Sequence, residues 1–139
     1  MHRRPLGAGR RLAALAAIVI ALACFLPWWQ SSGDFGLTPL SNNAFDGAGA
    51  LVFYAALAII ALLALPYAAG DVPVAIDRPL SFIFVTVVAW LALVVHLLGI
   101  ATRDLEALLP QRAYGLWLAV VGLIVLSRAV SLIAGERRR

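Results

Sequence analysis

Two ionisable side chains lie inside hydrophobic runs of this sequence, where polar groups are costly to place and therefore informative. His96 lies in the run 80–101, and Arg128 lies in the run 113–134. An imidazole at that depth can handle a proton, contact a ligand near the outer mouth, or satisfy a structural hydrogen bond. The structural role is the favoured interpretation for His96. Its expected partners are Tyr114, a hydroxyl or carboxylate of the first connection, or a backbone carbonyl.

Arg128 and Asp46 are the other polar candidates for function. The stem of Arg128 is long enough to carry its guanidinium to the lipid headgroups, which is the favoured interpretation for this residue. Asp46 lies just before the run 48–69. A carboxylate there is predicted to cap the N-terminus of the second helix, where free N–H groups and the positive end of the helix dipole meet.

The usual enzyme sites lack the residues they need. A haem held by two histidines is not expected, because His2 lies in the N-terminal tail, and the single cysteine, Cys24, cannot supply a dithiol. A zinc site takes three or more ligands, and no spacing of histidine, cysteine and acidic residues provides them. No run holds paired carboxylates, and no glycine-rich phosphate loop is present. We predict no enzymatic activity, no cofactor and no metal site.

Four hydrophobic runs must position these side chains. They cover residues 12–29, 48–69, 80–101 and 113–134, and none has a polar face. A helix of about 22 residues is roughly 33 Å long, enough to cross the ~30 Å hydrocarbon core of a bilayer. Hydrophobic residues make up 63% of the chain and charged residues only 13%. We predict an all-α fold, a bundle of four transmembrane helices between basic tails at 1–11 and 135–139.

The arginines predict how the chain is oriented. With both termini on one side, nine arginines and three acidic residues lie on that side, against two arginines and four acidic residues on the other. Because positive charge is retained in the cytoplasm, both termini are predicted to be cytoplasmic. The pI near 10.2 is then explained by tails that face anionic lipid headgroups. We expect the bilayer to be the partner of these tails, and no nucleic acid.

Small residues recur at helical spacing in the third and fourth runs, which is typical of positions where helices pack closely. One seam is Ala89, Ala92 and Gly99, on the same stripe as His96. The other is Gly115, Ala119 and Gly122. These seams predict either a compact bundle or contact with another membrane protein or a second copy of this chain.

The junctions of the runs resemble those of small uncharacterised four-span membrane proteins of actinobacteria and similar GC-rich bacteria. The resemblance rests on Phe-Leu-Pro-Trp-Trp at 25–29, Asn-Ala-Phe-Asp-Gly at 43–47 and Arg-Ala-Tyr-Gly-Leu-Trp at 112–117. It implies a bundle in the bacterial plasma membrane. We predict a non-enzymatic assembly or interaction subunit that uses its helix seams and first external loop. The alternative is an oligomeric transporter or channel component with His96 near its outer mouth.

Overall fold

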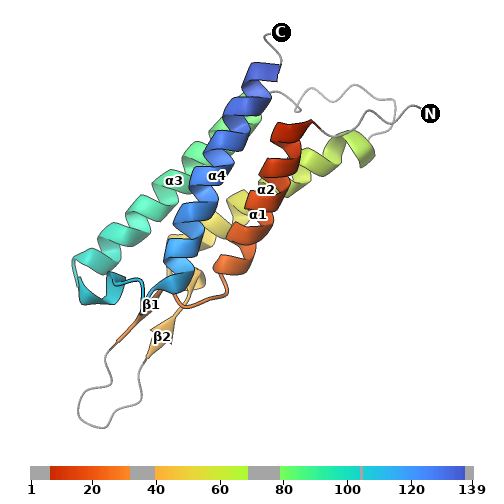
Figure 1. Ribbon diagram of the computed structural model, residues 1–139. Coiled ribbons are helices and arrows are strands. Elements are labelled where there is room, and N and C mark those ends of the chain that lie inside the picture. The colour runs from red at the N-terminus through yellow and green to blue at the C-terminus, as the bar shows by residue number, and fades with distance from the viewer. Residues whose placement is uncertain (1–6, 32–39, 69–78, 104, 137–139) are drawn as a thin grey trace.

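The computed structural model describes residues 7–31, 40–68, 79–103 and 105–136, which form four helices and a small hairpin (Figure 1). The helices are α1 (Ala8–Ala23), α2 (Gly49–Ala68), α3 (Pro79–Ala101) and α4 (Tyr114–Glu136). Strands β1 (Trp29–Gln30) and β2 (Ser41–Asn42) pair antiparallel, with Trp29 opposite Asn42. Two short 3-10 helices, η2 (Ala44–Asp46) and η3 (Glu106–Leu108), lie near the hairpin end of the bundle.

Three of the four helices, α2, α3 and α4, are long and apolar enough to cross a membrane. Their bounds differ by at most two residues from those of the second, third and fourth hydrophobic runs. The chain is therefore a helical, membrane-embedded protein. Most of the two arginine-rich tails and the connection between α2 and α3 lie outside the described residues.

The first helix is shorter than the predicted span 12–29. It has 16 residues, which gives a length of about 24 Å, less than the ~30 Å core. The apolar run continues to Trp29, but its last part is not helical. The amide of Trp28 donates to the carbonyl of Asn42 at 2.8 Å, and the amide of Ala44 donates to the carbonyl of Cys24 at 3.3 Å. These bonds turn the chain into the hairpin, and the fourth span stays a prediction.

Helices α1 and α4 pack closely along their lengths. A Cβ built at Gly9 would lie 3.0 Å from Ile133, and one built at Gly122 would lie 2.6 Å from Ile20. At Gly115 it would lie 2.8 Å from the carbonyl oxygen of Pro27. Glycine at these positions allows the backbones to approach. The small-residue seam of α4 is therefore filled by α1 and by the residues that directly follow it, Leu26 and Pro27.

We expect Gly115→Ala to destabilise the bundle by about 1–3 kcal/mol, because the new methyl group meets backbone that cannot move aside easily. It would also disturb the hydrogen bond from the Gly115 amide to Pro27, which is 3.0 Å long. The free energy of unfolding in mixed detergent micelles measures this loss. Gly135→Ala is the matched control, because nothing lies within 4 Å of its Cβ position on the same helix. Equal stability of the two variants would contradict close packing at Gly115.

Candidate functional site

His96 lies near the end of α3 and faces the interior of the bundle, with only 9% of its surface exposed. Its Nδ1 atom accepts a hydrogen bond from the amide of Gly49, the first residue of α2, at 3.2 Å. The edge-to-face contact with Trp28 holds the other side of the ring, with centroids 5.0 Å apart. The imidazole thus caps the N-terminus of a neighbouring helix. Its partner is an amide N–H, and neither Tyr114 nor a loop side chain serves as predicted.

The hydrogen bond to Gly49 determines where the ring carries its proton. A backbone amide can only donate, so Nδ1 must be an acceptor without hydrogen. A neutral imidazole then has its hydrogen on Nε2. Nε2 is buried and has no hydrogen-bond partner among the described residues. His96 therefore presents one unused N–H donor.

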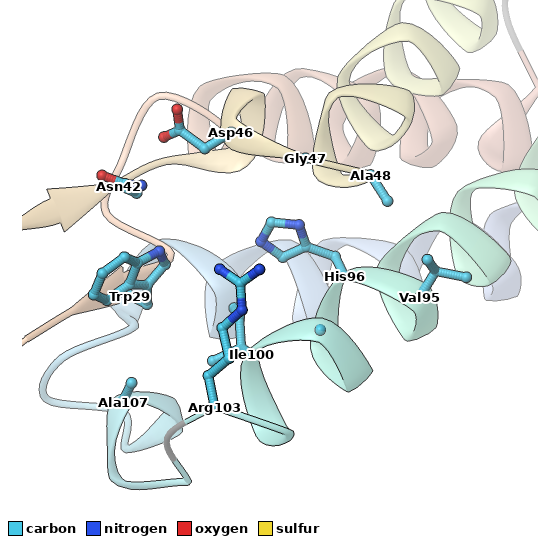
Figure 2. A pocket seen from close by; sticks show the side chains of 11 residues that line it. Trp29, Asn42, Asp46, Gly47, Ala48, Val95, His96, Ile100, Arg103 and Ala107 are labelled. Carbon is cyan, nitrogen blue, oxygen red and sulfur yellow. The ribbon is translucent and has the colours of Figure 1, made fainter.

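The ring of His96 lines a cavity of about 300 Å³ at the hairpin end of the bundle (Figure 2). We call it the His96 cavity. Its lining comes from the hairpin (Trp29, Asn42), from the end of η2 and the link to α2 (Asp46, Gly47, Ala48), from the end of α3 (Val95, His96, Gly99, Ile100), from Arg103 just beyond it, and from η3 (Ala107). Typical ligand pockets begin at about this volume.

Arg103 brings a second donor to the same cavity. It lies just after α3, seven residues from His96, and so follows the same stripe of that helix. Figure 2 shows its guanidinium extended toward the imidazole of His96, with the indole of Trp29 beside them. Within the described part of the chain, no carboxylate pairs with this guanidinium. The cavity thus combines the positive charge of Arg103 and the negative charge of Asp46 with a buried N–H group.

Asp46 lines the cavity, but it caps a different element from the one predicted. Its Oδ2 atom accepts from the amide of Asn43 at 3.2 Å, and the side chain of Asn43 accepts from the amide of Phe45 at 3.1 Å. This reciprocal pair closes η2. The backbone at Gly47 is extended and separates Asp46 from Gly49, so α2 begins beyond the reach of this carboxylate. His96 occupies the capping position instead.

Arg128 lies on the exposed face of α4, away from the His96 cavity. Its carbonyl accepts from the hydroxyl of Ser131 at 2.7 Å. An exposed guanidinium in this half of α4 is consistent with extension toward headgroups. The structure therefore does not bring Arg128 and His96 into one site.

The predicted seam of the third helix has two different environments: two of its residues pack in the core and one lines the cavity. Ala89 and Ala92 are buried in the core. Gly99 lines the His96 cavity and has no atom within 4 Å of its Cβ position. On α4, Ala119 is buried beside Gly115 and Gly122. Open space at Gly99 is a feature of the cavity, not of a close helix contact.

The sequence analysis did not single out Trp29, Asn42 or Arg103 as parts of a site. Arg103 could have been found from its position, because residues 96, 99 or 100, and 103 recur on one helical face. Trp29 and Asn42 carry no comparable signal, since their place depends on the register of the hairpin. In the described residues, no group of three or more histidine, cysteine, aspartate or glutamate side chains could hold a metal ion.

Comparison of the chain with protein families, with curated proteins and with solved structures finds no match. The class of protein is therefore defined by the fold and the cavity: a helical, membrane-embedded protein with a largely apolar cavity, lined in part by His96, Arg103 and Asp46, at one end of its bundle.

Proposed function

We propose that this chain is a non-enzymatic interaction subunit of a bacterial plasma membrane, and that it binds a chemical group of its partner molecule in the His96 cavity. The observation that supports this most directly is the buried Nε2 atom of His96. A buried donor without an acceptor costs about 1–3 kcal/mol. A ligand that supplies the acceptor removes that cost.

The packing of the seams favours the cavity as the place of interaction. Gly122 is covered by Ile20 of α1 and Gly115 by Leu26 and Pro27 just after it, so neither is free to receive a helix of another chain. The hairpin end instead presents open space beside polar groups. The arginine distribution supports cytoplasmic termini, which would place this cavity on the outer side of the membrane.

Binding is a better explanation than transport for the polar groups in the helices. The hydroxyl of Thr86 donates to the carbonyl of Phe82 at 2.8 Å. The hydroxyl of Ser127 donates to the carbonyl of Leu123, also at 2.8 Å. Both hydroxyls thus donate within their own helices, and that of Ser127 also accepts from the indole of Trp90 at 3.0 Å. In the described helices they do not extend the His96 cavity across the bundle.

A cavity-filling substitution tests the proposed function. Gly99→Leu places a side chain into open space at the cavity wall, and should fold because no atom lies within 4 Å of its Cβ position. Native mass spectrometry after mild extraction from the host should show the wild-type chain with an additional bound mass. We expect Gly99→Leu to lose that mass.

Gly135→Leu is the matched control, since Gly135 is equally open but does not line the His96 cavity. It should keep the bound mass. A wild-type chain without any bound mass, or a mass that survives in Gly99→Leu, would overturn the proposed function. The bound mass would also distinguish a small molecule from a partner protein.

A further inference from the structure

We propose that the group held in the His96 cavity is an oxyanion, a phosphate or a carboxylate, bound between the Nε2–H of His96 and the guanidinium of Arg103. This inference rests on the proposed function and narrows it to one class of chemical group. It is carried by the donors that converge on the cavity and by the absence of a matching acceptor for them in the described residues.

The imidazole contributes a donor and no acceptor. Nδ1 already accepts from the Gly49 amide at 3.2 Å, so Nε2–H is the only ring group left to bond a ligand, which reaches this buried atom by displacing the atoms that cover it. A ligand that directed its own N–H at Nε2 would be repelled, because both groups are hydrogen-bond donors. The ring therefore selects a ligand with an exposed lone pair at this position.

The guanidinium of Arg103 carries a positive charge, so it favours a negatively charged acceptor over a neutral one. Arg103 presents a planar fork that matches two oxygens of a phosphate or carboxylate. Figure 2 shows it directed toward the same space as His96. A neutral acceptor could use the imidazole, but it would not offer the Arg103 guanidinium the pair of charged oxygens that its fork matches.

The start of α2 adds to the same potential. Gly47 and Ala48 line the cavity immediately before the first turn of this 20-residue helix. The positive end of the helix dipole therefore faces the cavity, which favours negative charge there. The only acidic lining residue among those described, Asp46, accepts the Asn43 amide in the cap of η2.

The test uses the two histidines of the chain, His2 and His96, labelled selectively with nitrogen-15. Side-chain nitrogen spectra in detergent micelles should show His96 as the Nε2–H form. Titration with inorganic phosphate at constant ionic strength should shift the Nε2 signal of His96 in a saturable way. His2 provides an internal reference for non-specific effects.

Three variants separate specific binding from general electrostatics. Arg103→Gln should weaken phosphate binding by about tenfold or more, because a charge-assisted hydrogen bond is lost. Arg128→Gln removes the same charge far from the cavity and should leave the affinity unchanged. Asp46→Asn removes a negative charge from the lining and should strengthen phosphate binding, whereas a cation site would be weakened by it.

The same chemistry could come from a lipid headgroup or from a soluble anion, and a second arm distinguishes these sources. In phospholipid nanodiscs without added phosphate, a His96 spectrum that already matches the phosphate-bound form would assign the site to a headgroup. A nanodisc spectrum that still responds to phosphate would assign it to a soluble oxyanion. Either result supports the proposal.

The oxyanion assignment would be overturned if the His96 signal did not change in either the micelle titration or the nanodisc experiment. It would also be overturned if wild type and Arg103→Gln responded equally to phosphate. The proposed function has a separate outcome, because it depends on the mass lost in Gly99→Leu. If that mass is lost but the bound molecule is neutral or cationic, the interaction role stands and the oxyanion assignment fails. If no mass is bound, the proposed function fails, and the oxyanion assignment still stands or falls with the phosphate titration of His96.

Discussion

Replacing Trp28 by alanine is expected to lower the free energy of unfolding by about 3–5 kcal/mol, the usual loss for a large buried side chain. Trp28 is the largest of the fully buried side chains of the described core, with 0% of its surface exposed. Its indole N–H donates to the carbonyl of Ala23 at 3.0 Å and its ring packs against His96. One residue thus joins the end of α1 to α3.

Equilibrium unfolding in mixed micelles of a mild and a denaturing detergent measures this effect. Trp28→Phe should recover most of the stability, because it restores much of the ring volume and loses only the indole hydrogen bond. Trp117→Ala is the matched control, since 44% of Trp117 is exposed. A loss as large in Trp117→Ala as in Trp28→Ala would show that burial at Trp28 is not the cause.

Replacing His96 by phenylalanine should open the first turn of α2. The substitution preserves a ring of similar size but removes the acceptor for the Gly49 amide. A buried donor left unsatisfied costs about 1–3 kcal/mol. The Gly49 amide should then exchange its hydrogen with solvent much faster than in the wild type.

His96→Asn provides the comparison, because its side-chain oxygen can take the position of Nδ1 and continue to accept from Gly49. Its Gly49 amide should stay protected, although the smaller side chain lowers global stability. Hydrogen exchange followed by nuclear magnetic resonance measures the exchange rate of the Gly49 amide in both variants. Unchanged protection in His96→Phe would contradict the assignment of His96 as the cap of α2.

The long helices could be predicted from the sequence because hydrophobic runs of membrane length have few alternative folds. The end of α1 could not, because Phe25 and Leu26 continue the run without a break in hydrophobicity. Pro27 marks the region but not the residue at which the helix ends. The hydrogen bond between Ala44 and Cys24 fixes that end, and it joins segments that are not adjacent in the chain.

His96 could be identified as a candidate because an ionisable residue inside a hydrophobic run requires an explanation. Its partner could not be identified, since the amide of Gly49 carries no side-chain signal and depends on how α2 and α3 align. The same limit applies to Asn42, which reaches the cavity only through its pairing with Trp29. Sequence patterns identified the chemistry-bearing residue but not its surroundings.

The close packing of α1 against α4 has a consequence for how the chain is made. Helix α1 leaves the ribosome well before α4, and Gly9 of α1 packs against the distant residue Ile133 of α4. Contacts between distant residues form slowly because a long loop must close first. The small-residue face of α1 therefore stays exposed to lipid or to insertion factors until α4 has been synthesised.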